Sequence, residues 1–531
     1  MVNSYFGGII LLKMVKKYPN SHTKSNKKCV LFFPNKVFLY LCGKIKACFM
    51  SNLIGRNSEI SQLKSLYNSN KSQFVAVYGR RRVGKTFLID EALKGKITFR
   101  HAGLSPVDES GKFNMLKDQL KHFYNSLLLH GVKKKKCPAS WQEAFFMLEQ
   151  HLRSIDDGSR QVVFIDELPW MDTARSGFVT ALEGYWNSWA CHRSNLMLVV
   201  CGSATSWMQD NLINNHGGLY GRITYEIKLS PFTLAECEAF YKSAQVRFSR
   251  YDIVQSYMMV GGIPFYLGYF DHTLSLSQNI NKLFFEKNAR LRGEYDRLFS
   301  SVFSNPDEMK SIIEMLSTRR SGYTRAELVS SLKLKPGGAV TKALKSLIAS
   351  DFIVKYVPHG YNERSARYKL VDPLCLFYLR YVKGNAELNP EFWTHNELTQ
   401  SVISWRGFAF EELCLGHIKQ IKAALGIAGV LSTQSAWSLR GSDDVEGSQI
   451  DLLIKRADNV VNMCEMKFYN DDFTVTKSYD RTLVRRENAL AQSLKRHTTI
   501  HPTLITTYGL KHNEYSGNFV SVVTMDDLFR E

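Results

Sequence analysis

The chain has 531 residues, of which 44% are hydrophobic and 22% charged, so a single small module, a disordered chain and a membrane bundle are excluded. Lys and Arg number 69 against 49 Asp and Glu, which gives a net charge of +20. Residues 1–49 hold nine Lys and no Arg, Asp or Glu, so the rest of the chain carries +11. This excess suits a polyanionic partner such as nucleic acid or nucleotide phosphate.

The ten Cys are scattered without a CxxC pair, which argues against a zinc finger or a disulfide framework and favours free thiols in a reducing cytoplasm. No apolar run reaches the roughly 20 residues that span a bilayer, so we expect a cytoplasmic protein with no membrane contact. We interpret residues 1–49 as a non-native extension, with the folded protein starting near Met50. The alternative, a signal peptide, lacks a clean apolar core and a small-residue cleavage site.

Apolar runs alternate with amphipathic stretches between residue 50 and about residue 245. Strands alternating with helices favour a parallel sheet with crossover helices, so we predict an α/β domain over residues 50–245. The expected strands are 74–78, 97–99, 161–165 and 196–201, and the expected helices are 86–93 and the stretch 108–155.

Four further segments complete the predicted order. Residues 246–300 are helical around a Gly-Gly-Ile-Pro break. Residues 301–372 show three helices and a hairpin, the pattern of a winged helix-turn-helix, with a capping box from Thr324 to Glu327. We expect residues 373–400 to be a linker and residues 401–531 to be a separate α+β domain.

The segment from residue 79 to residue 86 reads GRRRVGKT and matches the Walker A pattern in full. It follows an apolar strand and opens a helix, so backbone N–H groups would surround a phosphate at the helix N-terminus. Lys85 would neutralise the β- and γ-oxygens, and the Thr86 hydroxyl would bind Mg²⁺. The expected nucleotide-binding residues are Gly79, Arg80, Arg81, Arg82, Val83, Gly84, Lys85 and Thr86.

A second apolar run, residues 162–165, ends in Asp166 and Glu167. Asp166 at the tip of a buried strand would bind the Mg²⁺ shell, and Glu167 would polarise the attacking water. The alternative is an exposed acidic turn after a strand, which the upstream phosphate loop makes less plausible.

Two polar residues follow the next apolar strand. Ser203 would hydrogen-bond the γ-phosphate or the attacking water, unless it is a simple turn residue before a helix. Arg222 would act as an arginine finger on the γ-phosphate of a neighbouring copy, and the alternative is a surface salt bridge.

Residues 50–300 resemble bacterial and archaeal AAA-type ATPases related to the signal-transducing, apoptosis-like NTPase group. The resemblance implies an ATP- and Mg²⁺-dependent core followed by a winged helix, with Pro264 capping the adenine side. The matching pieces are Ile54-Gly55-Arg56 with Glu59, GRRRVGKT, FIDELPW from Phe164, CGSA from Cys201, LYGR from Leu219, Leu229–Phe232, and GGIP from Gly261.

Two C-terminal runs, residues 449–454 and 460–468, read as the strands of a hairpin. Asp451 then falls opposite Glu465, and Lys467 shares the face of Glu465 because strand side chains alternate with period two. Carboxylates of Asp451 and Glu465 at a sheet edge can hold Mg²⁺, and a Lys beside the metal can activate water.

The layout Asp-x13-Glu-x-Lys resembles the PD-(D/E)XK nuclease fold, and residues 401–531 resemble as a unit the restriction-endonuclease-like domain that closes many of these ATPases. The resemblance implies catalytic roles for Asp451, Glu465 and Lys467, with Glu411 as a further acid near the metal at the start of a helix. The usual Pro before the first Asp is absent. The alternative is an ordinary exposed hairpin with paired charges.

The sequence therefore predicts an AAA-type ATPase with a P-loop core, a helical lid, a winged helix and a nuclease-like domain. ATP binding would close the lid and the winged helix on the core. The first hypothesis is an ATP-regulated nuclease acting on DNA or RNA as a homo-oligomer, and the second is a non-catalytic ATP sensor or scaffold with vestigial acids. Winged-helix cations would meet DNA phosphates if that domain binds a duplex, namely Lys333, Lys335, Lys342 and Lys345.

Overall fold

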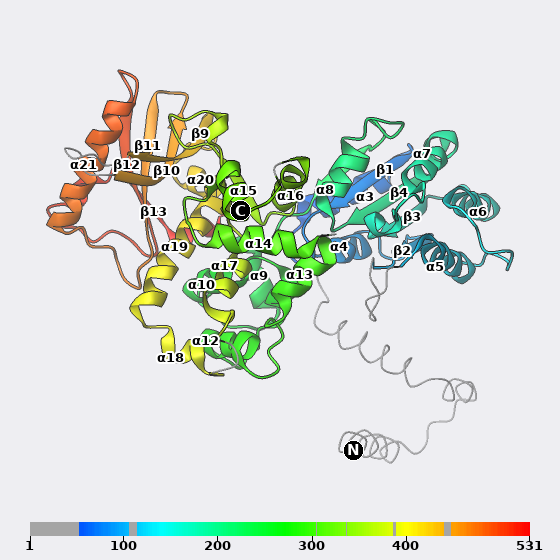
Figure 1. Ribbon diagram of the computed structural model, residues 1–531, viewed down its shortest axis with the longest axis horizontal. Helices are drawn as coiled ribbons and strands as arrows, with labels where there is room; N and C mark the ends of the chain where they lie inside the picture. The colour runs from blue at the N-terminus through cyan, green and yellow to red at the C-terminus, as the bar shows by residue number, and fades with distance from the viewer. Residues whose placement is uncertain are drawn as a thin grey trace, which may run out of the picture. The chain divides into compact units, whose positions relative to one another are not determined.

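A five-stranded parallel sheet forms the centre of the N-terminal domain, in the order β2-β3-β4-β1-β5 (Figure 1). Every residue of the two central strands β1 and β4 is buried, as a parallel sheet covered on both faces requires. The computed structural model describes residues 53–105, 114–303, 305–335, 337–385, 389–439 and 448–530. The strands are β1 Gln73–Tyr78, β2 Phe99–Ala102, β3 Gln161–Asp166, β4 Leu196–Gly202 and β5 Tyr225–Lys228.

The described residues from Ile54 onward belong to one compact unit, Ile54–Glu531. The basic tail of residues 1–49 lies outside the described residues. The domain boundaries expected from the sequence beyond residue 54 all fall within this one unit. Among the described residues, no helix combines the length and the apolar character that a bilayer crossing needs.

Aromatic side chains from two helices pack on one face of the sheet. Trp141 and Phe145 of α6 contact Phe178 of α7, and the Trp141 and Phe178 ring centroids lie 5.0 Å apart. The helix expected within 108–155 is in fact two, α5 and α6, and β2 begins two residues later than predicted. The helices of this domain are α3 Asn57–Tyr67, α4 Lys85–Ala92, α5 Leu116–Leu129, α6 Trp141–Ser154, α7 Phe178–Ser188 and α8 Thr205–Met208.

The next segment is helical, as predicted. Gly261 ends α10 with a φ of 68°, and a Cβ at Gly262 would lie 2.1 Å from the Phe232 carbonyl oxygen, so the Gly-Gly break is needed for this close approach. The elements are α9 Leu234–Ser243, α10 Arg250–Val260, α11 Pro264–Leu267, α12 Leu276–Ile280, the π-helical turn η4 Asn281–Phe285 and α13 Glu294–Val302.

Residues 306–370 form three helices and a three-stranded antiparallel sheet of order β6-β8-β7. The capping box predicted from Thr324 to Glu327 is present at the start of α15. The elements are α14 Pro306–Ser317, β6 Tyr323–Thr324, α15 Arg325–Ser331, α16 Gly338–Ala349, β7 Ile353–Tyr356 and β8 Arg367–Leu370.

The segment expected to be a linker, residues 373–400, holds the helices α17 Pro373–Phe377 and α18 Phe392–Asn396. Phe377 and Trp393 are fully buried, and their ring centroids lie 5.1 Å apart. Because burial of such large aromatic side chains stabilises a packed segment, this part of the chain is a folded helical connection.

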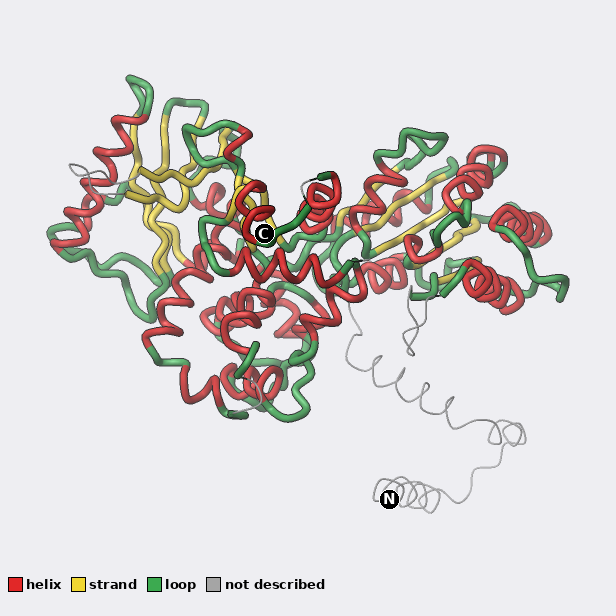
Figure 2. The backbone as a smooth tube through the Cα atoms, viewed as in Figure 1, coloured by secondary structure: helices red, strands yellow, loops and turns green. Residues whose placement is uncertain are grey.

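The C-terminal region is a mixed five-stranded sheet of order β13-β12-β11-β10-β9 with helices packed against it (Figure 2). Strands β9, β10 and β11 are antiparallel neighbours, whereas β11, β12 and β13 run parallel. The elements are α19 Gln400–Gly416, α20 Ile418–Ala424, β9 Ser432–Leu439, β10 Ser448–Arg456, β11 Val460–Lys467, α21 Lys477–Ser493, β12 Thr499–Thr506 and β13 Ser521–Thr524.

Candidate functional site

The loop between β1 and α4 has the geometry that the phosphate-loop motif requires. Gly79 has a φ of 145°, and a Cβ there would lie 2.3 Å from the Leu229 carbonyl oxygen. Gly84 has a φ of 92° and precedes Lys85, the first residue of α4. Both positions need glycine, and the loop leads directly into a helix N-terminus, which is where an anion is best held.

The side chain of Lys85 is buried within this loop, with a relative exposure of 5%. Its Nζ donates hydrogen bonds to the carbonyl oxygens of Gly79 at 3.0 Å and Arg80 at 3.1 Å. The ammonium group therefore lies inside the loop that would surround phosphates, where its charge is screened little by water.

Asp166 lies at the end of β3, beside the start of α4. Its Oδ2 accepts a hydrogen bond from the Thr86 hydroxyl at 2.8 Å, and its Oδ1 accepts one from the Cys201 thiol at 2.6 Å. Burial, together with the charge of Asp166, raises the pKa of Cys201, so the thiol stays a donor. A hydroxyl and a carboxylate in contact fit a Mg²⁺ ion in this place, since Mg²⁺ prefers oxygen ligands. Nothing in the sequence around Cys201 indicates this contact with Asp166.

Glu167 has a φ of 46°, a left-handed conformation that is uncommon outside glycine and concentrates at functional sites. Its Oε2 accepts hydrogen bonds from the Ser203 backbone N–H at 3.0 Å and from the Ser203 hydroxyl at 2.8 Å. Ser203 is almost completely buried at the end of β4. In this structure Ser203 therefore holds the Glu167 carboxylate.

Replacing Ser203 by Ala should lower the rate of ATP hydrolysis by about tenfold with little change in ATP affinity, because a carboxylate that positions water would lose one of its two donors. Ser188→Ala, which alters an exposed serine of α7, is the matched control. Phosphate release and nucleotide binding measure the two quantities, and an unchanged rate for Ser203→Ala would contradict this role.

The three arginines of the loop make contacts that the sequence did not indicate. Arg80 is buried in an ion pair with Asp372 and lies over the Phe352 ring at 4.5 Å. Although burial alone would lower it, the charge of Asp372 raises the pKa of Arg80. The Arg80 side chain thus faces protein, so contact of Arg80 with a nucleotide would come from its backbone.

Arg81 and Arg82 point to two other parts of the domain. Arg81 lies over the Trp170 ring at 5.9 Å. Arg82 forms an ion pair with the buried Glu294 at the start of α13 and lies over the Phe265 ring at 4.3 Å. The loop is therefore tied through Arg82 to the segment that follows the Gly-Gly break.

The two remaining candidates of the ATPase domain lie in different surroundings. Pro264 is buried as the first residue of α11, next to Phe265, which Arg82 contacts. Arg222 is exposed, and within the described residues it forms no ion pair, so the salt-bridge alternative is not what this structure shows.

The C-terminal acids lie on the predicted hairpin. Leu452 of β10 pairs with Cys464 of β11, so Asp451 and Glu465 are the next residues at the same end of the two strands. Glu465 is nearly buried, and its Oε2 lies 3.7 Å from the Lys467 ammonium nitrogen. Glu465 and Lys467 thus lie on one face of β11, as period-two alternation requires.

Two residues of α21 that the sequence analysis missed also contact Glu465. Arg486 Nη1 donates to both carboxylate oxygens at 2.7 Å, and the Tyr479 hydroxyl donates to Oε2 at 2.8 Å. The sequence gives one indication of this arrangement. Tyr479 and Arg486 are seven positions apart, so they lie on one face of a helix. In this structure the Glu465 carboxylate is thus fully occupied by protein donors.

Glu411 lies inside α19, not at the start of a helix as expected. Burial, followed by the charges of Asp451 and Glu412, raises the pKa of Glu411 to about 8. Glu411 and Asp451 line the same cavity, and carboxylate oxygens are ligands that a divalent ion prefers. Among the described residues, however, no three His, Cys, Asp or Glu side chains converge as a metal-binding group, so Glu465 does not join this pair.

The geometry of residues 73–203 is that of a P-loop NTPase, and comparison with known proteins agrees. Residues 53–270 match the family described as an ATPase domain predominantly from Archaea, which supports a P-loop ATPase domain in this part of the chain.

Two proteins of Methanocaldococcus jannaschii are similar in sequence. Uncharacterized protein MJECL04 is 26% identical over 367 residues, which are 68% of this chain and 76% of that protein. Uncharacterized ATP-binding protein MJ0423 is 44% identical over 43 residues, which are 8% of this chain and 73% of that protein. The solved structure of the Walker-type ATPase PABY2304 of Pyrococcus abyssi is similar over 62% of this chain and 97% of that protein, with 18% identity and a TM-score of 0.44.

Proposed function

We propose that the chain hydrolyses ATP as a conformational switch and that this switch controls a metal-dependent, nuclease-like C-terminal domain acting on DNA. In this proposal residues 246–300 are the lid, residues 301–372 a winged helix-turn-helix and residues 401–531 a PD-(D/E)XK-like domain. The observation that carries it is a direct ion pair between Arg80 of the phosphate loop and Asp372, which lies just after the helices and strands of residues 306–370.

The ATPase chemistry is assigned to residues of the phosphate loop and the ends of β3 and β4. Lys85 would bind the β- and γ-phosphate oxygens, and Thr86 and Asp166 would hold Mg²⁺, which offsets the phosphate charge when it is bound. Glu167 would orient the attacking water, and Ser203 would position Glu167.

Coupling to the C-terminal domain is supported by a second chain of contacts. Helix α10 ends at the Gly-Gly break before Pro264, and its other end carries Tyr251. The Tyr251 ring stacks on Phe468 at 5.1 Å with an angle of 8° between the planes. Phe468 directly follows Lys467 of the nuclease-like motif, so a movement of α10 would reach that motif.

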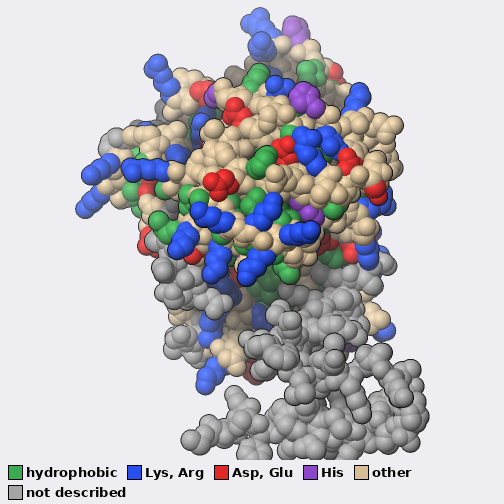
Figure 3. Space-filling model, turned by 90° about the vertical axis from the view of Figure 1, so that its right-hand side faces the viewer, with side chains coloured by type: hydrophobic (Ala, Val, Ile, Leu, Met, Phe, Trp, Pro, Cys, Tyr) green, Lys and Arg blue, Asp and Glu red, His purple; other side chains and the backbone are tan. Residues whose placement is uncertain are grey.

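DNA contact by the winged helix is supported by one face of α16. Helix α16 also packs against α8 of the ATPase domain, where the Ser346 and Ser206 hydroxyls lie 3.1 Å apart. Lys342 and Lys345 remain exposed and could meet backbone phosphates. Figure 3 looks onto the end of the molecule that the ATPase domain forms, where Lys and Arg side chains are interleaved with uncharged, acidic and His side chains.

A homo-oligomer is supported by the exposure of Arg222. Because its guanidinium has no partner within the described residues, it is free to act as an arginine finger on the γ-phosphate of a neighbouring copy. The neighbouring Tyr220, which is 72% exposed, adds an apolar surface for such a contact.

The second candidate, a non-catalytic ATP sensor with a vestigial nuclease fold, is favoured by one specific observation. The Glu465 carboxylate is already occupied by Arg486, Tyr479 and Lys467. A carboxylate held in this way must release protein donors before it binds a metal ion.

Cleavage of plasmid DNA by the full chain with Mg²⁺ separates the two candidates. We expect nicking by the wild-type protein and at least a 100-fold loss in Asp451→Asn, because a metal-binding carboxylate would be replaced by an amide. Asp458→Asn, in the turn of the same hairpin, is the matched control and should cleave normally. No difference between Asp451→Asn and wild type would contradict the nuclease assignment.

A further inference from the structure

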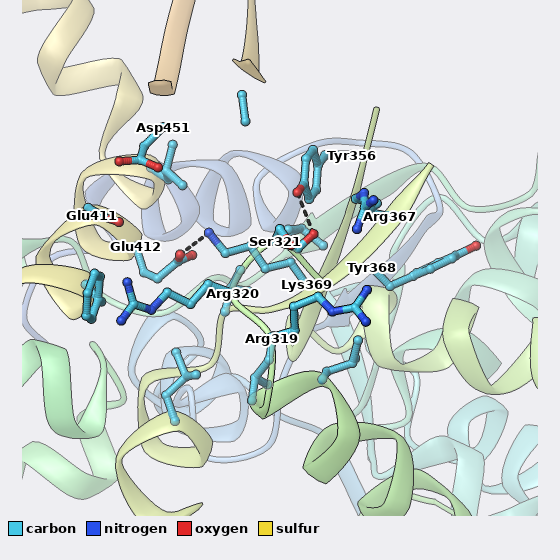
Figure 4. A pocket seen from close by; sticks show the side chains of 18 of the residues that line it. Arg319, Arg320, Ser321, Tyr356, Arg367, Tyr368, Lys369, Glu411, Glu412 and Asp451 are labelled. Atoms are coloured by element: carbon cyan, nitrogen blue, oxygen red, sulfur yellow. Dashed lines mark hydrogen bonds and ion pairs between the residues drawn. The ribbon is translucent and has the colours of Figure 1, made fainter. Parts of the chain in front are cut away.

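A cavity of about 2160 Å³ lies between the 306–370 module and the C-terminal domain (Figure 4). Its walls come from β6, the β7–β8 hairpin, helix α19 and strands β9 and β10. Sites for small molecules have volumes of about 300–1,000 Å³, so this cavity is large enough for a stretch of a polymer.

The charge of the cavity wall favours an anionic ligand. The described residues that line it include ten Lys and Arg but only six Asp and Glu. A backbone of phosphates is a suitable ligand for such a surface.

Arg320 brings this positive charge next to the carboxylates. It belongs to the 306–370 module, yet its guanidinium lies over the ring of Phe408 in α19. Figure 4 shows Arg320 extending toward the side of the cavity where Glu411, Glu412 and Asp451 lie. Burial lowers the pKa of Arg320, and the charges of Glu411 and Asp451 oppose this.

The β7–β8 hairpin adds aromatic side chains to the same cavity. Tyr356, Tyr361 and Tyr368 line it, and Tyr361 in the connecting loop is 52% exposed. Proteins that bind single-stranded nucleic acid combine a basic groove along the backbone with aromatic rings on which the bases stack. A duplex keeps its bases stacked inside and offers no free base for such a ring.

The hairpin is fixed to the C-terminal domain, so both walls are formed in advance. The His359 N–H donates to the Ala436 carbonyl oxygen of β9 at 2.9 Å. Lys369 of β8 forms an ion pair with Glu412 of α19, and both side chains are mostly buried. A preformed site loses less conformational entropy when it binds a flexible ligand.

We infer that this cavity binds a single strand of nucleic acid, with Arg320 holding a backbone phosphate beside Asp451 and Tyr361 stacking on a base. The inference rests on the proposed function, because it makes the cavity the substrate channel of the nuclease-like domain. It adds that the 306–370 module supplies a positioning residue, Arg320, to a site whose carboxylates belong to another domain.

Fluorescence anisotropy of the full chain with a labelled 12-nucleotide single strand in EDTA tests this inference without any cleavage. We expect the single strand to bind at least tenfold more tightly than a duplex of the same sequence. Arg320→Ala and Tyr361→Ala should each weaken binding about tenfold, whereas Tyr361→Phe should retain it because the ring remains. Arg320→Ala should also make the affinity fall less steeply with salt concentration, by the amount expected for the loss of about one phosphate contact.

Two exposed residues of the ATPase domain provide matched controls, Tyr225→Ala and Arg153→Ala, and both should bind like wild type. Equal affinity for the duplex, or equal losses in the controls, would overturn the inference even if plasmid cleavage requires Asp451. Single-strand binding that depends on Arg320 and Tyr361 would support it even if no cleavage is found, in which case the nuclease assignment alone fails.

Discussion

Replacing Lys85 by Ala should abolish ATP hydrolysis and weaken ATP binding at least 100-fold. The ammonium group is buried in the loop, 3.0 Å and 3.1 Å from the Gly79 and Arg80 carbonyl oxygens. Bound phosphates would replace these carbonyls as partners, and an interaction between charges in a site that excludes water is strong. Titration with a fluorescent ATP analogue and phosphate release measure the two effects.

Lys94→Ala is the matched control, since Lys94 is exposed just beyond α4 and forms an ion pair with Glu91. It should bind and hydrolyse ATP like the wild-type chain. If Lys85→Ala bound ATP with wild-type affinity, the loop would not be the nucleotide site.

Glu167→Gln should bind ATP normally but hydrolyse it about 100-fold to 1,000-fold more slowly. The amide keeps the size of the side chain and an oxygen that can accept from Ser203, but it can no longer take a proton from water. The variant should therefore accumulate with ATP bound, which single-turnover hydrolysis and analysis of the bound nucleotide would detect.

Glu149→Gln, in α6, removes a half-buried carboxylate whose ion pair among the described residues is with Arg153, and it should leave hydrolysis unchanged. Hydrolysis by Glu167→Gln at the wild-type rate would show that another group activates the water. In that case the hydrogen bonds from Ser203 would be structural.

The phosphate loop could be predicted because its determinants are local. Strand β1, the two glycines and the first turn of α4 lie within 20 residues, and the spacing alone specifies their conformation. The capping box of α15 is local in the same way. The Asp166 and Glu167 pair could be placed because parallel strands end at one edge of a sheet.

Contacts between distant segments could not be predicted. Arg80 and Asp372 are 292 positions apart, and nothing in either neighbourhood indicates the other. Arg486 and Tyr479 reach Glu465 only because α21 packs across the sheet. The helical character of residues 373–400 depends on the burial of Trp393, which a charge and composition pattern does not reveal.

The C-terminal site has some features that local sequence determines and others that contacts between distant segments determine. The hairpin and the position of Asp451 follow from period-two alternation and a short turn, which are local. The presence of Asp451 and Glu411 in one cavity and the occupation of Glu465 by α21 are set by tertiary packing.

The most direct test of the central claim is plasmid cleavage with Mg²⁺, measured with ATP, with a non-hydrolysable ATP analogue and without nucleotide. If the nucleotide state controls the C-terminal domain through Arg80 and Asp372, cleavage should change at least tenfold on addition of ATP. Lys85→Ala should then cleave at one rate in all three conditions, and Asp451→Ala should not cleave in any. Cleavage that requires Asp451 but is identical with and without ATP in the wild-type chain would contradict the switch.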